Sequence, residues 1–293
     1  MYVKFWGVRG SIPTPGPDTV KYGGNTPCLE VRTDEGDCII LDAGTGIRPL
    51  GLLLARKMPI TASLFITHTH WDHIQGLPFF IPLFVPGNQL SIYGASDPVT
   101  MLGIKDVLSV QMEYRYFPVR EAELKATLSY ASLHEGETVS VGSASITPIV
   151  MNHPVFTLGY RIESNGKTLF YTGDHEQHSN IYAPEDEDYS EYEKWIVEKR
   201  QQLVDFIHGC NLLIADAQYT ESEYPGKIGW GHSTHEAGLA LAKESGAKSL
   251  LLTHHEPTRP DSALDAIHER VRETGLALGL EAGLAYEGLE VVL

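Results

Sequence analysis

Residues 68–73 hold the densest group of metal-binding side chain types in the chain. They read His68-Thr69-His70-Trp71-Asp72-His73 and follow an apolar run that ends at Thr67. Side chains two residues apart in an extended segment point to the same side, so His68 and His70 can bind one metal ion. A turn after them can bring Asp72 and His73 to a second ion. The spacing therefore predicts two divalent metal sites within one short segment.

Several apolar runs end on a side chain that can bind a metal or transfer a proton. These ends are Leu41-Asp42, Thr67-His68, Asn152-His153, Gly173-Asp174, Ala215-Asp216 and Thr253-His254. Ionisable groups are costly inside a sheet, but at strand ends they can converge on a polar site above the core. We expect these ends to meet at one sheet edge. There Asp174 could bridge two metals, with His153 completing one ligand set and His254 the other, a combination suited to zinc or manganese.

The elements that position these residues alternate between strands and helices. Apolar runs rich in β-branched residues predict strands, whereas apolar residues at three- and four-residue spacing predict helices. The predicted strands cover 38–41, 64–67, 146–151, 168–172, 212–215 and 249–253, and the predicted helices cover 189–207, 234–245 and 262–274. Asn165-Gly166 between two strand-like runs is typical of a tight hairpin, so the sheets should be mixed. The pattern indicates a layered α/β fold with a two-sheet sandwich.

Size and charge limit the classes of partner. The 293 residues fit one α/β domain, 1–293, with an acidic loop and helix at about 176–208 as an insertion. The chain has 22 Lys and Arg against 38 Asp and Glu, a net charge of −16. This charge argues against long nucleic acid as a partner, because phosphate contacts supply most of that affinity. A small anionic substrate is compatible with this net charge, because bound metal ions would attract it.

Cysteine usage and the N-terminus indicate the compartment. The chain has an odd number of cysteines, Cys28, Cys38 and Cys210, without a C-x-x-C pair, which argues against a disulfide framework and against a cysteine zinc site. We expect neither a signal peptide nor a membrane span, because the N-terminus lacks a basic segment followed by an apolar one and no apolar run reaches about 18 residues. We therefore expect a cytoplasmic protein without a membrane partner.

Residues 68–73 match the H-x-H-x-D-H motif of the metallo-β-lactamase superfamily, and the chain resembles that family over most of its length. The resemblance implies a four-layer αββα sandwich of two mixed sheets. It implies two divalent ions, Zn²⁺ in first place with Mn²⁺ as the alternative, and Asp42 would orient a ligand. The implied ligands are His68, His70 and His153 for one metal, Asp72, His73 and His254 for the other, and Asp174 as the bridge.

Further segments resemble the phosphodiesterase branch of the superfamily, which includes tRNase Z and small cyclic nucleotide phosphodiesterases. They are Asp216-Ala217-Gln218-Tyr219, Gly231-His232-Ser233-Thr234 and Leu252-Thr253-His254, and the opening Val8-Arg9-Gly10-Ser11 and Gly23-Gly24-Asn25-Thr26 resemble bacterial members. A hydroxide bridging the metals is then the expected nucleophile, with Asp72 in the catalytic set. His232 would act as general acid, held by Asp216. The expected substrate is a small phosphodiester, first a 3′,5′-cyclic nucleotide, and related enzymes often form homodimers.

Two competing hydrolase functions would use the same metal ligands, and two other classes of protein would not. A tRNase Z-like RNA 3′ endonuclease is the nearest alternative, but the net charge and the short chain between His153 and Asp174, where that family carries a substrate-gripping arm, argue against it. A lactam or thioester hydrolase has no need of His232 with Asp216. A flavo-diiron protein would have a carboxylate at the position of His70, so the imidazole there argues against iron. A family member that only binds a nucleotide or a partner would have lost metal ligands, whereas the set here is complete.

Other conspicuous residues have simpler interpretations. We interpret the remaining histidines as structural or surface residues: His134, His175, His178, His208, His235, His255 and His268. Trp71, Tyr219 and Trp230 could stack on a nucleobase, although packing is the preferred interpretation. Substrate choice is expected to depend on loops at 101–118 and 176–188.

Overall fold

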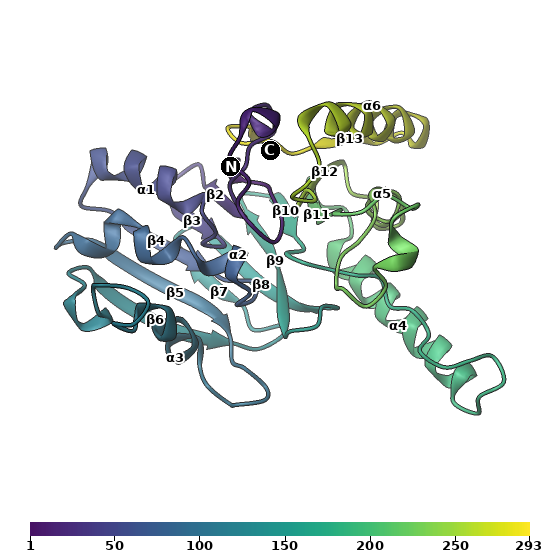
Figure 1. Cartoon of the computed structure of the whole chain (residues 1–293), viewed down its shortest axis with the longest axis horizontal. Helices are drawn as coiled ribbons and strands as arrows, with labels where there is room; N and C mark the ends of the chain where they lie inside the picture. Colours follow the sequence, from purple (N-terminus) through teal and green to yellow (C-terminus); the bar gives the residue numbers. More distant parts are fainter.

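The strands form two mixed sheets of seven strands each in the computed structural model, which describes residues 1–293 (Figure 1). The first sheet has, in spatial order, β14 (Glu290–Val292), β1 (Tyr2–Gly7), β2 (Cys28–Arg32), β3 (Cys38–Leu41), β4 (Thr61–Phe65), β5 (Gln89–Ala95) and β6 (Thr127–Leu133). The second has β13 (Glu281–Leu284), β12 (Ser249–Thr253), β11 (Leu212–Asp216), β10 (Lys167–Tyr171), β9 (Thr157–Ser164), β8 (Ala144–Met151) and β7 (Val139–Val141). Strands β3 to β6 and β10 to β13 pair in parallel, and the others antiparallel.

The two-residue period of the strands divides their apolar side chains between two layers of core. In β3, Ile39 and Leu41 pack between the sheets, whereas Ile40 faces the helices beside the first sheet. In β11, Ile214 packs between the sheets and Leu213 faces the helices on the other side. Strands buried on both faces read as continuous apolar runs, which explains why the sequence shows them so clearly.

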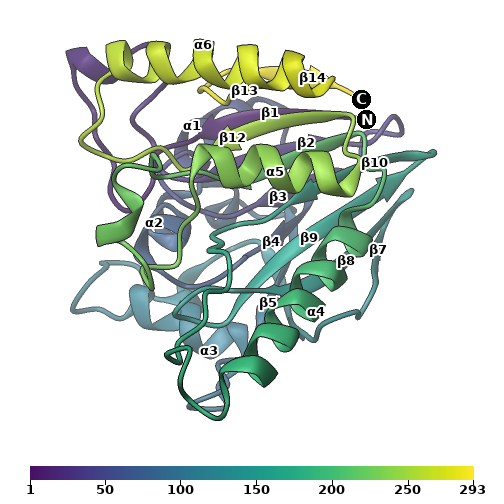
Figure 2. The same cartoon turned by 90° about the vertical axis from the view of Figure 1, so that its right-hand side faces the viewer.

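Helices cover the outer face of each sheet (Figures 1 and 2). The core beside the first sheet includes residues of α1 (Ile47–Leu54), α2 (Trp71–Ile74) and α3 (Ile104–Ser109), and the core beside the second includes α4 (Tyr189–Ile207), α5 (His235–Ser245) and α6 (Asp261–Leu278). Short 3-10 helices lie at Pro17–Thr19, Ala55–Lys57, Leu77–Phe79, Ile81–Phe84, Val110–Met112, Glu121–Glu123 and Tyr224–Gly226. The four-layer αββα sandwich is therefore confirmed. No helix is long and apolar enough to cross a bilayer.

Most predicted elements are present near their predicted bounds. The helix at 189–207 is α4, and α5 begins one residue late because Thr234 is its N-cap, accepting a hydrogen bond from the backbone N–H of Ala237. The tight turn at Asn165 and Gly166 joins β9 to β10 in antiparallel pairing. The prediction for α6 ended too early, before Gly275. That glycine lies inside the helix, where an added Cβ would come within 2.7 Å of the Ala282 Cβ in β13, so it allows close packing.

The acidic segment at 176–208 consists of irregular chain up to Asp188 followed by α4. The helix connects the parallel strands β10 and β11, and its C-terminal residues Leu203, Val204 and Ile207 are buried. Its N-terminal end extends away from the rest of the molecule (Figure 1). That this segment is an insertion, and that 1–293 is one domain, stay predictions.

Candidate metal centre

Several predicted site residues lie at or soon after strand ends, whereas Asp72 and His73 lie in α2 and His232 lies in the loop before α5. Asp42 directly follows β3, Asp216 is the last residue of β11 and His254 directly follows β12. Asp42 and His254 both adopt left-handed backbone conformations, with φ of 61° and 63°. Ends from both sheets contribute, so the expectation of a single sheet edge is corrected: two sheets packed face to face bring their strand ends to one shared site.

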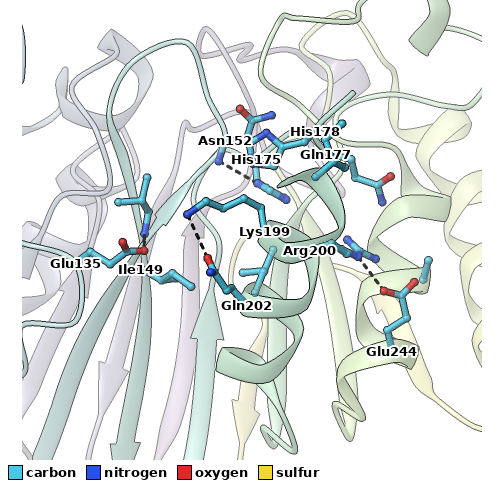
Figure 3. A pocket seen from close by; sticks show the side chains of 14 residues that line it. Glu135, Ile149, Asn152, His175, Gln177, His178, Lys199, Arg200, Gln202 and Glu244 are labelled. Atoms are coloured by element: carbon cyan, nitrogen blue, oxygen red, sulfur yellow. Dashed lines mark hydrogen bonds and ion pairs between the residues drawn. The ribbon is translucent and has the colours of Figure 1, made fainter. Parts of the chain in front are cut away.

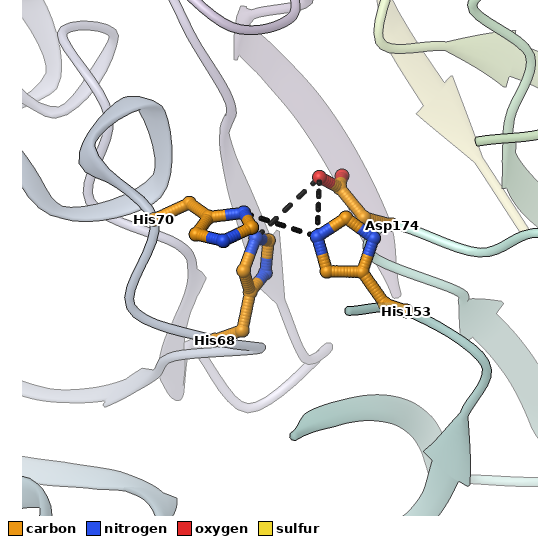
Figure 4. Close-up of side chains that lie close together, drawn as sticks. All are labelled: His68, His70, His153 and Asp174. Carbon is orange, nitrogen blue, oxygen red and sulfur yellow. Dashed lines mark hydrogen bonds and ion pairs between the residues drawn. The ribbon is translucent and has the colours of Figure 1, made fainter. Parts of the chain in front are cut away.

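One group of potential ligands consists of three histidines and a carboxylate (Figure 4). His68 Nε2 lies 3.4 Å and His153 Nε2 lies 3.8 Å from Oδ2 of Asp174. His70 Nδ1 lies 3.0 Å from His153 Nε2. The ligand atoms of the group lie within 4.8 Å of one another, so a single ion could contact all of them.

A second group shares Asp174 through its other oxygen. His73 Nε2 lies 3.1 Å and His254 Nε2 lies 3.2 Å from Oδ1 of Asp174. Oδ2 of Asp72 lies 3.1 Å from His254 Nε2 and 3.4 Å from His73 Nε2. The structure thus brings together all seven residues predicted as metal ligands, with Asp174 between the two groups.

Hydrogen bonds to the second ring nitrogens orient these histidines. His73 Nδ1 lies 2.8 Å from Asp42 Oδ2, as the predicted orienting role requires. His153 Nδ1 lies 2.8 Å from the carbonyl oxygen of Gly231, and His254 Nδ1 lies 3.0 Å from Gln218 Oε1. In each of these three histidines, the contact at Nδ1 leaves Nε2 pointing toward Asp174. A bound metal needs this arrangement, because it fixes the tautomer and the ring direction.

Three supporting residues were missed by the sequence analysis as contributors to the site. Gln218 lies in the Asp216–Tyr219 motif without a pattern that marks it as a hydrogen-bond partner of His254, and the backbone N–H of Ser11 donates to Oδ2 of Asp72 at 2.8 Å. Glu176 accepts from the backbone N–H groups of Gly229 and Gly231 at 2.8 and 2.7 Å. It therefore holds the loop that carries the Gly231 carbonyl and leads into His232. Ser11 belongs to the opening motif Val8-Arg9-Gly10-Ser11, and this motif was the sequence feature that could have indicated its contact with Asp72.

The charges of the centre fit a cation. Asp42, Asp72, Asp174 and Asp216 are all buried close together, an arrangement that is costly unless positive charge compensates it. Burial raises the pKa of Asp72, but the imidazoles of His73 and His254 outweigh this effect and lower it.

Two further features support a bound cation: the protonation states of the histidines, and buried polar atoms that lack a partner. Burial lowers the pKa of His73, but Asp174, Asp72 and Asp42 outweigh it, so the ring holds a proton where a metal could bind. Burial lowers the pKa of His68, which leaves its ring neutral. His68 Nε2 is buried without a hydrogen-bond partner, and Asp174 Oδ1 meets only the Nε2 atoms of His73 and His254. Nitrogen and oxygen atoms left in this state are the donors that a divalent ion would take up.

His232 and Asp216 form a hydrogen-bonded pair beside this centre. His232 Nδ1 lies 2.8 Å from Oδ2 of Asp216 and 3.8 Å from Oδ2 of Asp174. The ring stacks on His254 at a centroid distance of 4.8 Å. Burial lowers the pKa of His232, but the charges of Asp216 and Asp174 outweigh it and raise the pKa to about 9. Without bound metal, the ring therefore carries a proton at neutral pH.

The histidines interpreted as structural lie outside the two ligand groups around Asp174. His175 directly follows Asp174, and its backbone N–H donates to Asp216 Oδ2 at 3.1 Å. Burial, with a smaller effect of His178, lowers its pKa to about 3. Its ring accepts from the backbone N–H of Asn152 and faces the opposite side of the segment.

Comparison with curated proteins finds relatives over most of the chain. An uncharacterised protein of Mycobacterium tuberculosis is 26% identical over 264 residues, covering 86% of this chain and 79% of the relative. Ribonuclease Z of Lachnoclostridium phytofermentans is 27% identical over 304 residues, covering 90% of each chain.

Solved structures share the fold. The metallo-β-lactamase fold protein YhfI of Bacillus subtilis superposes with a TM-score of 0.68 at 19% identity, covering 99% of this chain and 98% of its own. Yeast PDE1 superposes with a TM-score of 0.64 at 18% identity, covering 100% and 99%. A diphosphatase of the PhnP family gives 0.64 at 20% identity, covering 100% and 97%.

The family model described as the beta-lactamase superfamily domain matches residues 38–255, which include every metal ligand predicted above. The chain belongs to the metallo-β-lactamase superfamily of metal-dependent hydrolases, in the branch that holds the ribonuclease Z-like enzymes.

Proposed function

We propose that this protein is a dinuclear metal-dependent phosphodiesterase that hydrolyses a small phosphodiester, in first place a 3′,5′-cyclic nucleotide. The observation that carries the proposal is the position of the His232 and Asp216 pair beside the shared carboxylate of Asp174. The alkoxide that leaves a phosphodiester needs a proton, which a positioned imidazolium can donate. A lactam or thioester hydrolase has less need of such a group.

The proposed ligands are His68, His70 and His153 for one ion and Asp72, His73 and His254 for the other, with Asp174 between them. When bound, two divalent ions, Zn²⁺ or Mn²⁺, would lower the pKa of water at the centre and offset negative charge on the phosphoryl oxygens. Asp216 holds Nδ1 of His232 and leaves Nε2 to donate a proton to the leaving group. Asp42 holds His73 in the orientation that presents Nε2 to the centre.

Two observations support a small substrate. The net charge of −16 opposes a long polyanion. Between His153 and Asp174 the chain contains only β9, the turn at Asn165 and Gly166, and β10, so no arm that could hold an RNA projects there. The relation to ribonuclease Z keeps RNA 3′ cleavage as the rival activity.

The test is hydrolysis of a panel by metal-loaded protein: cyclic AMP, cyclic GMP, bis(p-nitrophenyl) phosphate, a pre-tRNA and a β-lactam. We expect turnover of a cyclic nucleotide that requires metal and is lost in Asp72→Ala. Cleavage of only the pre-tRNA or only the lactam would overturn the substrate assignment. A homodimer and a cytoplasmic location stay predictions, and light scattering of the purified protein tests the former.

A further inference from the structure

A hollow of about 320 Å³ lies beside the second sheet, between the end of β8, residues 175–178, α4 and α5 (Figure 3). It shares no residue with the proposed metal ligands. Its volume lies at the lower end of the range for small-molecule sites, about 300 to 1,000 Å³. The hollow is therefore large enough for a small organic molecule.

Part of its lining is apolar. Ile149 comes from β8, Ile196 and Leu203 from α4, and Ala240 from α5. Such a surface accepts the hydrocarbon part of a ligand, because burying it from water is favourable.

The remaining lining offers hydrogen-bond donors that lack partners. Lys199 Nζ contacts only the neutral Oε1 of Gln202, at 3.2 Å, and has no carboxylate within 4.0 Å. Arg200 pairs with Glu244 through Nε at 2.8 Å, which leaves its two terminal nitrogens free. Gln177 adds an exposed side-chain amide to the lining. In Figure 3, Lys199 and Arg200 rise from α4 below the segment that carries Gln177.

The lining of the hollow carries two basic and two acidic side chains, Lys199, Arg200, Glu135 and Glu244. Arg200 pairs with Glu244, and Glu135 accepts from the backbone N–H of Val150 at 3.0 Å, which leaves Lys199 as the cation without a carboxylate partner. Burial lowers the pKa of His178, and the charge of Lys199 lowers it further, so this ring adds a neutral donor. Charged donors bind a carboxylate or phosphate more strongly than neutral ones do.

We propose that this hollow is a second binding site, which takes a small organic anion. A carboxylate or phosphate group of the ligand contacts Lys199 and the free nitrogens of Arg200. Its apolar body packs on Ile149 and Leu203.

The site is connected to the proposed catalytic pair through His175. Its ring lines the hollow, while its backbone N–H donates to Asp216 at 3.1 Å and its carbonyl accepts from Ser233 Oγ at 2.6 Å. Arg200 and Asp216 also line one narrow cavity together. An anion that moves His175 would therefore change the position of Asp216 and, through it, of His232. This second part rests on the proposed function.

The binding test is isothermal titration calorimetry of metal-loaded protein with benzenesulfonate, phenylphosphonate and benzoate. We expect at least one anion to bind wild-type protein and the control Lys194→Met, which removes the same charge from an exposed position of α4. Lys199→Met should weaken this binding at least about tenfold, and Ala240→Trp, which fills the hollow, should abolish it. Any anion bound at the metals would persist in both variants.

Equal binding by all four proteins, or no binding to wild-type protein at millimolar concentrations, would overturn the second site. The connection is tested by turnover of bis(p-nitrophenyl) phosphate with and without the bound anion. We expect the rate to change in wild-type protein and to stay constant in Lys199→Met, and an unchanged rate in both overturns the connection alone. If no member of the substrate panel is turned over, the proposed function fails while calorimetry still decides the binding site.

Discussion

His73 Nδ1 lies 2.8 Å from Oδ2 of Asp42, and this contact directs Nε2 of the same ring toward Asp174 at 3.1 Å. Asp42 also accepts from the backbone and hydroxyl of Thr67 and from the hydroxyl of Tyr171, at 2.8 to 3.0 Å. The carboxylate is therefore the shared acceptor of several buried donors, and it acts on the proposed metal site through His73.

Replacing Asp42 by Asn should lower metal affinity about 10- to 100-fold, as observed for residues that orient a ligand. The side-chain NH2 group of the new Asn would face hydrogen-bond donors and could not accept from them. The ring of His73 would then lose the contact that fixes its orientation. Titration of metal against a chelating dye measures the change. Asp37→Asn, at the turn between β2 and β3, is the control. Equal metal affinity in a folded Asp42→Asn protein would contradict the orienting role.

Replacing His232 by Ala should lower kcat by about 10² to 10⁴-fold on a phosphodiester with an alkoxide leaving group. The loss should be much smaller for bis(p-nitrophenyl) phosphate, whose leaving group departs without a proton. Metal content, measured by elemental analysis, should be unchanged. Asp216→Asn should give the same selective pattern with a smaller loss. Full activity of His232→Ala on the alkoxide substrate would refute the general acid.

The pH dependence follows from the protonated state of His232. A general acid must hold its proton, so the rate falls as pH rises through its pKa. Asp216 and Asp174 overcome burial and raise this pKa to about 9 without metal, and bound cations would lower it from that value. We therefore expect an alkaline decline of kcat at or below about pH 9 for the alkoxide substrate. The decline should be absent in His232→Ala, and a decline that persists there would assign the titration to another group.

The residues of the two groups around Asp174 could be singled out from the sequence because each depends on a local pattern. Asp174 and His254, for example, come soon after buried strands, and the strand pattern places such residues at the end of the core. Gln218 and the N–H of Ser11 act through contacts between distant segments, and neither a glutamine nor a backbone N–H is distinguished by its type. Periodicity therefore predicts where ligands emerge, whereas the groups that orient them depend on tertiary packing.

The same distinction explains the end of α6. Gly275 indicates a helix end by its intrinsic propensity, but packing against β13 outweighs that cost and the helix continues to Leu278. The helix ends where Gly279 adopts a left-handed conformation with φ of 72°. Two glycines in one helix thus have opposite roles, which only the neighbouring strand distinguishes.

Two glycines before His232 offer a matched pair of variants. Gly231 and Gly229 both have positive φ, 87° and 85°, so alanine strains the backbone equally at each. An added Cβ at position 231 would lie 2.2 Å from Nδ1 of His153, whereas at 229 it would meet nothing within 4 Å.

Gly231→Ala should therefore displace His153 and weaken binding of one metal by about tenfold or more. Gly229→Ala should show only the cost of strain, about 1 kcal/mol of stability, with both metals retained. Metal stoichiometry and thermal unfolding separate these effects. If both variants lose metal alike, the loss reflects the strained backbone and not the contact with His153.

Trp230 lies directly before Gly231 and His232, and 57% of it is exposed. Lys227 Nζ lies 3.9 Å from the centre of its ring, so the indole is held in place while one face can still meet a ligand. Packing at the rim of the site and stacking on a nucleobase both fit this position, but only stacking requires a substrate with a base.

If Trp230 stacks, Trp230→Ala should raise KM for cyclic AMP about 5- to 150-fold, the value of one base–aromatic contact. A cyclic ribose phosphate without a base should show no change in KM, and neither substrate should respond to Ile228→Ala in the same loop. An equal rise for both substrates would mean that Trp230 shapes the loop, because removal of a stacking surface can affect only the substrate that carries a base.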